Sequence, residues 1–282
     1  MFIAKTIAEA RAAVAKLRAE KKCIGLVPTM GALHEGHISL VRAAKAHCNA
    51  VVATIFVNPT QFAPGEDLEK YPRTFEADCT ALEKEGVDVL FAPEASEMYP
   101  SGASTVVEVE GISDRLDGQS RPGHFRGVAT VVAKLFNIVE PNHAFFGQKD
   151  AAQVAVLRRM VRDLNFNLEL VVCPTVREPD GLALSSRNRY LSPEQRQQAL
   201  VLSRALRGVE AEVGAGVVES EPLIDAGLAV LADEPEIRVD YFRIVDPETL
   251  EEVADVTEGA LVAVAAVVGP ARLIDNVVIP RR

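Results

Sequence analysis

The chain has 282 residues, of which 48% are hydrophobic and 25% charged, the balance of an ordinary globular protein. Its formal net charge of −10 argues against nonspecific binding to nucleic acid or to an anionic membrane, because both attract a cationic surface. The longest apolar run, Ala260–Val268, is far shorter than the ~20 residues of a membrane helix. Charged residues interrupt the N-terminal segment, so no secretory signal is predicted. The four cysteines form no CxxC pair, which favours reduced thiols in a cytoplasmic protein.

The first part of the chain alternates amphipathic helices with continuous apolar strands. This alternation indicates a parallel sheet covered on both faces, which binds its ligands at the carboxyl ends of the strands. The predicted elements are a helix over 7–17, a strand at Cys23–Val27, a helix around 38–44, a strand at Ala50–Val57, a helix at Phe75–Glu85, a strand at Val87–Ala92, a short strand over 106–109, a helix over 128–139, a strand at His143–Phe146, a helix at Asp150–Leu164 and a strand at Leu168–Cys173.

The pattern changes after about Thr175. Ser192 followed by Pro193 and then Gln195 is typical of a capped helix start, and this helix is expected to break at Gly214–Gly216. A second helix follows, and then three β-like runs. We therefore expect an α/β protein: a Rossmann-like parallel-sheet domain over residues 1–175, then a smaller α+β domain with an antiparallel sheet over 176–282. The predicted elements of this second part are a helix at Pro222–Leu231 and strands at Val239–Val245, Ala260–Val268 and Leu273–Ile279.

The loop PTMGALHEGH, residues 28–37, follows the first predicted parallel strand. The next helix, expected to start near His37, offers free N–H groups and the positive end of its dipole, which favour a phosphate group. His34 and His37 add donors that can be neutral or cationic near neutral pH. A tight strand–helix turn with exposed histidines is the alternative. A zinc hydrolase is disfavoured, because the second histidine follows the first by three residues instead of four.

Two further polar loops are candidates for binding small anions or hydroxyl groups. VNPTQF, residues 57–62, places the amides of Asn58 and Gln61 after the second strand, although an ordinary polar turn explains the composition as well. RPGHFRG, residues 121–127, brings Arg121 and His124 to a helix start. It suits either an anion site or a solvated basic loop.

Two more loops carry groups that suit a nucleotide. In GQKD, residues 147–150, Lys149 offers a positive charge to a phosphate, and Asp150 can cap the helix or accept a ribose hydroxyl. Within residues 182–188, LALSSRN, the segment LSSRN places two hydroxyls before a guanidinium, a donor cluster suited to a polyphosphate, although turn formers have the same composition.

Each motif alone is weak, but the ordered set PTMGALHEGH, VNPTQF, RPGHFRG, FFGQKDAAQ and REPDGLALSSRN resembles the pantoate–β-alanine ligase family from about Val27 to Leu191. The resemblance implies an enzyme that joins (R)-pantoate to β-alanine with ATP and Mg²⁺ through pantoyl adenylate, releasing diphosphate and then AMP. It also implies a homodimer, while the cysteines and the net charge favour a cytoplasmic protein with no nucleic-acid or membrane partner.

The same resemblance implies roles for individual residues. His37, His34 and Lys149 would act in catalysis, with His37 as proton donor to the departing diphosphate. Gln61 and Gln153 would hold pantoate, Gln61 would also serve β-alanine, and Asn58 and Arg121 would make further substrate contacts. The implied ATP site comprises Met30, Gly31, Ala32, Leu33, His34, Glu35, Gly36, His37, Gly147, Gln148, Lys149, Asp150, Val176, Leu184, Ser185, Ser186 and Arg187. No resident metal ligand is implied.

Two other functions remain open from the residues. An adenylyl- or cytidylyltransferase would share the HxGH loop but would not need the pair VNPTQF and GQKD. A nonenzymatic nucleotide-binding regulator would share the fold, but the intact His34, His37, Lys149 and Arg187 argue against a decayed site. Pyrophosphate exchange into ATP that depends on pantoate would separate the ligase from both alternatives.

Overall fold

The computed structural model describes residues 1–20, 22–63, 65–66 and 68–281. Its strands are β1 Phe2–Ala4, β2 Ile24–Val27, β3 Ala50–Thr54, β4 Val89–Phe91, β5 His143–Gly147, β6 Glu169–Cys173, β7 Arg238–Val245, β8 Ala260–Val268 and β9 Ala271–Ile279. The α-helices are α1 Ile7–Ala19, α2 Glu35–His47, α3 Phe75–Lys84, α4 Ala95–Met98, α5 Asp117–Ser120, α6 His124–Val139, α7 Ala151–Asp163, α8 Pro193–Ala215 and α9 Ser220–Leu231. Short 3₁₀ helices are η1 Pro59–Gln61, η2 Gln148–Asp150 and η3 Ser186–Tyr190.

Six strands form a parallel sheet in the order β1-β4-β3-β2-β5-β6, as the continuous apolar runs predict. Successive side chains of a strand point to opposite faces, so each strand feeds two cores. Leu26 and Val52 pack with α1, α6 and α7, whereas Val27, Val51 and Ala53 pack with α2 and α3. The sheet is therefore covered on both faces, and the Rossmann-like prediction is confirmed.

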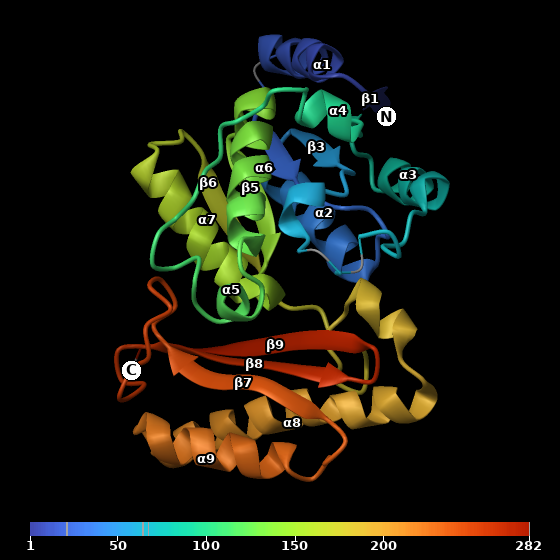
Figure 1. Ribbon diagram of the computed structural model, residues 1–282. Helices are drawn as coiled ribbons and strands as arrows, with labels where there is room; N and C mark the ends of the chain where they lie inside the picture. The colour runs from blue at the N-terminus through green and yellow to red at the C-terminus, as the bar shows by residue number, and fades with distance from the viewer. Residues whose placement is uncertain (21, 64, 67, 282) are drawn as a thin grey trace.

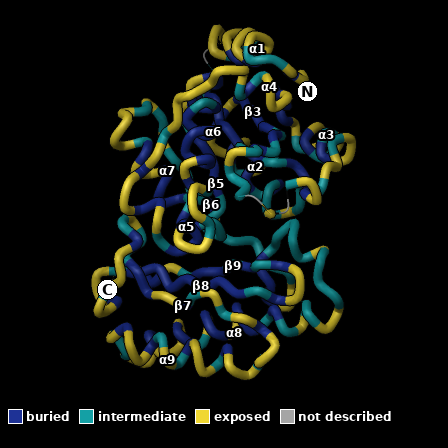
Figure 2. Tube along the Cα trace, in the orientation of Figure 1, coloured by how far each residue is buried: buried dark blue, intermediate teal, exposed yellow. Residues whose placement is uncertain are grey.

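The remaining strands form an antiparallel sheet in the order β7-β8-β9, with α8 and α9 packed against one face (Figure 1). β8 is buried along nearly its whole length, as the tube coloured by burial shows (Figure 2). Ser192 caps α8 through a capping box with Gln195, as predicted. The helix continues through Gly214 and ends at Ala215, and Gly216, with a φ of 107°, supplies a left-handed C-cap, so the helix breaks within the predicted stretch Gly214–Gly216. A domain boundary near Thr175 stays a prediction.

Two local expectations differ from the structure. The short strand predicted over 106–109 does not form, because the N–H of Val107 donates to the hydroxyl of Thr130 on α6 at 2.9 Å instead of to a neighbouring strand. Conversely, β1 was not predicted. It has only three residues at the edge of the sheet and pairs with β4, so its sequence carries almost no periodic signal.

Candidate active site

Three of the predicted loops leave neighbouring strands at the same edge of the parallel sheet. β2 lies between β3 and β5, so the loops that follow Val27, Thr54 and Gly147 start side by side. The chain moves to one side of β2 to form β3 and to the other side to form β5, which makes this edge a topological switch point. Ligands of open α/β sheets bind at such a point.

The loop PTMGALHEGH, residues 28–37, is called the HEGH loop from here on. Its two histidines organise the start of α2. The helix begins at Glu35 with His34 as N-cap, two residues before the predicted start. Nδ1 of His34 accepts from the N–H of Gly36 at 3.2 Å, and Nδ1 of His37 accepts from the N–H of His34 at 3.4 Å. Since each Nδ1 is an acceptor, each neutral ring carries its proton on Nε2. Both rings therefore offer Nε2–H as a donor.

Both histidines are neutral in the free protein at pH 7. Burial and the nearby positive charge of Lys149 lower the pKa of His34 to about 4, and burial and the neighbouring His34 lower the pKa of His37 to about 3. The expectation of rings poised between neutral and cationic forms near neutral pH is therefore wrong for the ligand-free state. The same interaction between His34 and Lys149 links the loop after β2 to the loop after β5.

These pKa values predict that the protein loses stability below pH 6.5. The unfolded chain then protonates both histidines, with pKa values of about 6.5, while the folded chain does not. Between pH 7 and pH 5 we expect each histidine to remove about 1–2 kcal/mol from the free energy of unfolding. Urea denaturation at both pH values measures this, with the double variant His34→Asn, His37→Gln as control. Carboxylates titrate in both proteins, so an identical pH dependence would contradict the assignment.

Asp78, a residue that the sequence did not single out, holds the backbone of the HEGH loop. Its buried carboxylate accepts from the N–H groups of Ala32 and Leu33, both at 2.9 Å, and from the hydroxyl of Thr74 at 3.1 Å. Gly31 and Ala32 have φ values of 81° and 51°, a left-handed turn that these two bonds stabilise. Asp78 is therefore a positioning residue. Its separation of 46 residues from Ala32 hid it from sequence reasoning.

Asn58 lies behind Gln61 instead of facing a ligand. Asn58 is only 1% exposed, and its Nδ2 donates to Oε1 of Gln61 and to the carbonyl of Gly127, both at 3.1 Å. Nε2 of Gln61 in turn lies 3.1 Å from Sδ of Met30 in the HEGH loop. The amide of Gln61 is thus held between the two loops, by Asn58 on one side and Met30 on the other.

A cavity of about 1130 Å³ opens beside these loops, between the parallel sheet and β9. Six predicted site residues line it. They come from the GQKD loop, α7, the LSSRN segment and the RPGHFRG loop: Lys149, Asp150, Gln153, Ser185, Arg187 and Arg121. Among these residues, the hydroxyl of Ser185 accepts from the N–H of Arg187 at 3.3 Å. The side chain of Asp150 makes no capping bond to α7, so the capping role is not observed, and Nζ of Lys149 lies 3.7 Å from Oδ1 of Asp150.

The RPGHFRG loop carries less available charge than its sequence predicts. Arg121 pairs with the carboxylate of Glu66 at 2.6 Å and 2.8 Å, and its Nη1 lies 3.0 Å from Nε2 of His124. Burial and Arg121 lower the pKa of His124 to about 4, so this ring is neutral at pH 7. The carboxylate of Glu66 therefore offsets the charge of Arg121, the first arginine of this loop.

Strand β9 of the C-terminal sheet contacts two of the loops that we expect to bind ATP, the GQKD loop and the segment REPDGLALSSRN. Nδ2 of Asn276 on β9 donates to the carbonyls of Gln148 at 3.0 Å and Lys149 at 2.9 Å. Arg177 makes a bidentate pair at 2.6 Å and 2.8 Å with Asp275, which is buried on the same strand. Between these anchors the N–H of Leu184 donates to the carbonyl of Val176 at 3.0 Å, which brings these two predicted ATP-site residues together.

The structure thus brings most of the predicted residues to one edge of the sheet. His34 and His37 interact electrostatically with Lys149 and Asp150, and a Cβ added to Gly36 would lie 3.9 Å from Cβ of Leu184.

Among the described residues, none of the helices has both the length and the apolar character of a membrane span.

Comparison with known proteins identifies the family of this chain. The family model described as pantoate–β-alanine ligase matches residues 2–278. The pantothenate synthetase of Acidobacterium capsulatum is 66% identical over 98% of this chain and 96% of its own length. The corresponding protein of Thermotoga petrophila is 56% identical over 99% and 100%.

Solved structures agree as well. The crystal structure of pantothenate synthetase from Thermus thermophilus superposes with a TM-score of 0.94 at 51% identity, covering 98% of this chain and 99% of that one. Pantoate–β-alanine ligase from Francisella tularensis, crystallised with a β,γ-ATP compound and β-alanine, gives a TM-score of 0.81 at 36% identity over 98% and 97%. The chain belongs to the pantoate–β-alanine ligase family and is an enzyme that joins pantoate to β-alanine.

Proposed function

We propose that the cavity at the switch point carries out this condensation in two steps, with ATP as the activating substrate. A carboxylate oxygen of pantoate attacks the α-phosphorus of ATP, and diphosphate leaves. The amine of β-alanine then attacks the activated carbonyl, and AMP leaves. The observation that carries this proposal is the convergence of the HEGH and GQKD loops beside a cavity lined by Lys149, Gln153 and Arg187. No nucleophilic side chain is needed, since both steps depend on positioning and charge stabilisation.

We assign the phosphate chemistry to His34, His37 and Lys149. The Nε2–H groups of the two histidines and the ammonium of Lys149 would bind the triphosphate, which adds negative charge beside buried neutral rings. That charge raises the pKa of His37 from its low value in the free protein, so that this residue can deliver a proton to the departing diphosphate. The remaining ATP contacts would come from two sets of residues. The first set lies in the loops after the strands, Met30–Glu35, Gly36, Gly147, Gln148 and Val176. The second set, Leu184, Ser185, Ser186 and Arg187, would close over the polyphosphate.

We assign the acid pocket to Gln61 and Gln153, with Asn58 as a positioning residue behind Gln61. Mg²⁺ would accompany ATP, because this ion is usually held by one or two carboxylates together with substrate phosphates. Asp150, with a side chain 48% exposed in the cavity wall, offers such a carboxylate.

Pantoate-dependent exchange of labelled diphosphate into ATP tests the proposed reaction. The ligase requires pantoate and does not require β-alanine for this exchange. Exchange without pantoate would favour an adenylyl- or cytidylyltransferase, and no exchange with any acid would favour a nucleotide-binding regulator.

We also propose the larger-scale organisation that the family resemblance implies: a cytoplasmic homodimer whose residues 176–282 form a domain that closes over residues 1–175. The anchors from β9 to Gln148 and Lys149 support a coupling between the two parts. Light scattering should give twice the chain mass of 30.4 kDa. Small-angle scattering should show a smaller radius of gyration with ATP and pantoate than without them.

The packing of α6 against the VNPTQF loop predicts a specific effect of Gly127→Ala. A Cβ at this position would lie 2.3 Å from the carbonyl oxygen of Thr60 and 2.7 Å from Cα of Gln61, so the backbone must shift. We expect a stability loss of about 1–3 kcal/mol and a higher KM for pantoate, with ATP affinity little changed.

Gly208→Ala on α8 is the matched control. Outside its own helix backbone, and among the described residues, an added Cβ would meet Cγ2 of Val230 alone, at 3.9 Å, so this variant should be as stable as the parent or more so. Thermal unfolding and steady-state kinetics measure both effects. An unchanged KM for pantoate in the Gly127 variant would show that the loop tolerates the displacement.

A further inference from the structure

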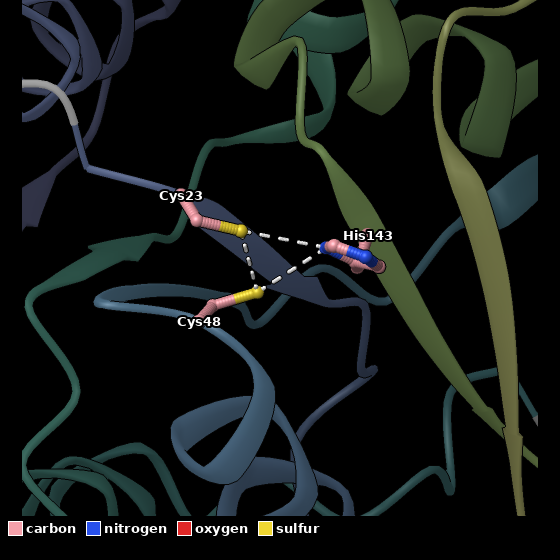
Figure 3. Close-up of side chains that lie close together, drawn as sticks. All are labelled: Cys23, Cys48 and His143. Carbon is pink, nitrogen blue, oxygen red and sulfur yellow. Dashed lines mark hydrogen bonds between the residues drawn. The ribbon is translucent and has the colours of Figure 1, made fainter.

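Three potential metal ligands converge at the edge of the parallel sheet opposite the active site. Cys23 directly precedes β2, Cys48 ends α2, and His143 begins β5, so all three lie at the amino ends of the strands. Sγ of Cys23 lies 3.3 Å from Sγ of Cys48, and Nδ1 of His143 lies 3.5 Å from each sulfur (Figure 3). The donors thus form a compact triangle that the ligase reaction does not use.

The backbone around this triangle is held by the sheet. The carbonyl of Cys23 accepts from the N–H groups of Asn49 and Ala50 at 3.1 Å and 3.0 Å, which fixes the start of β2 to the segment after Cys48. His143 is in register with Gly25 on β2. The three side chains are therefore carried by rigid elements, an arrangement that favours a preorganised ligand set.

The distances fit a tetrahedral ion of the zinc class. With bonds of about 2.3 Å to sulfur and 2.0–2.1 Å to nitrogen, such an ion separates a sulfur and a nitrogen ligand by about 3.5 Å and two sulfurs by about 3.8 Å. Both sulfur–nitrogen distances already have this value, and the sulfur–sulfur distance of 3.3 Å needs only a small rotation of a cysteine side chain.

The outer nitrogen of His143 has the partner expected beside a metal. Its Nε2 lies 3.4 Å from a carboxylate oxygen of Glu169 on β6. Metal-binding histidines usually donate their other N–H to a carboxylate or carbonyl, which fixes the ring and strengthens the ligand. A disulfide between Cys23 and Cys48 would explain neither this pair nor the equal distances from Nδ1 to the two sulfurs.

We propose that Cys23, Cys48 and His143 bind one thiophilic metal ion of the Zn²⁺ class. Two S–H bonds break, two sulfur–metal bonds and one nitrogen–metal bond form, and the two thiol protons pass to solvent. A water molecule completes the fourth position. Burial and the neighbouring Cys23 raise the pKa of the Cys48 thiol, so metal binding has to release its proton at neutral pH.

Metal titration of the reduced, tag-free full chain tests the proposal. Co²⁺ is the spectroscopic probe, and Zn²⁺ affinity is measured by competition with a coloured chelator. We expect one ion per chain, a thiolate-to-cobalt charge-transfer band that Zn²⁺ abolishes, and a rise in Tm with Zn²⁺, because a ligand of the folded state stabilises it. Ligase activity is not needed for any of these measurements.

Variants identify the ligands. Cys23→Ser and His143→Gln should each weaken Zn²⁺ binding at least about a hundredfold, because each removes a bond to the ion, and Glu169→Gln should weaken it about tenfold. Cys79→Ser, which removes a half-buried thiol on α3, is the matched control and should change nothing. Circular dichroism confirms folding of each variant, and His143→Gln keeps the test available if Cys23→Ser does not fold.

Three results would overturn the proposal. These are no uptake of either ion by the reduced protein at micromolar concentrations, equal uptake by Cys23→Ser and the parent, or unchanged affinity in His143→Gln. A Cys23–Cys48 disulfide formed in air, combined with no metal uptake after reduction, would identify a redox pair instead.

Discussion

Lys149→Ala is expected to reduce the rate of pantoyl adenylate formation about 10²–10³-fold, the range found when one preorganised donor to a developing charge is removed. The Lys149 side chain lines the cavity and is only 18% exposed, so its charge is weakly screened. Its field already lowers the pKa of His34, which shows that it acts across the gap between the loops after β2 and β5. The triphosphate is present only in the first half-reaction, so aminolysis of preformed pantoyl adenylate should change little.

The two half-reactions are measured separately, by diphosphate exchange and by single-turnover release of AMP from synthetic pantoyl adenylate. Lys45→Ala is the matched control. Lys45 lies on α2, where its ammonium donates to the carbonyl of Gly86, so the variant loses the same charge outside the cavity. Equal losses in both half-reactions of the Lys149 variant would show that Lys149 also serves AMP or has a structural role.

The parallel sheet could be predicted because its inner strands are continuous apolar runs, and a buried strand such as β3 needs no alternation. Each polar loop that follows such a strand could then be placed at one edge of the sheet. The sequence was uninformative where a single hydrogen bond decides whether a segment forms a strand. Val107 is β-branched and apolar like a strand residue, yet its N–H bonds to the Thr130 hydroxyl, and no local pattern shows this.

The site was predictable in its loops but not in its long-range contacts. In the sequence, Asp78 is one of several charged residues of the predicted helix Phe75–Glu85. Only the fold brings its carboxylate to the N–H groups of Ala32 and Leu33. In the same way, Glu66 neutralises Arg121 from 55 positions away. The protonation state of His37 was out of reach as well, because it depends on burial, and burial follows from how the loop packs.

Gln61→Ala is expected to weaken pantoate and β-alanine binding about tenfold to a hundredfold while leaving ATP affinity within a factor of about two. An amide can donate to and accept from the hydroxyl and carboxylate groups of pantoate, and removal of a buried partner costs about 1–3 kcal/mol. Asn58 holds Oε1 of Gln61 at 3.1 Å, so the amide is oriented before the substrate arrives. His37→Ala should instead impair the ATP-dependent step, because its ring belongs to the phosphate loop.

Gln61→Ala also removes one contact to the loop assigned to ATP, because Nε2 of Gln61 lies 3.1 Å from Sδ of Met30. The predicted difference between its effects on pantoate affinity and on ATP affinity therefore depends on how strong this contact is. A contact to a thioether sulfur is weak, so its loss should alter ATP binding far less than the loss of pantoate contacts alters pantoate binding. Calorimetry of both variants with ATP alone, and with pantoate alone, measures the two pockets independently. If Gln61→Ala loses ATP affinity as strongly as His37→Ala does, the VNPTQF loop is part of the nucleotide site, and the contact to Met30 is the reason.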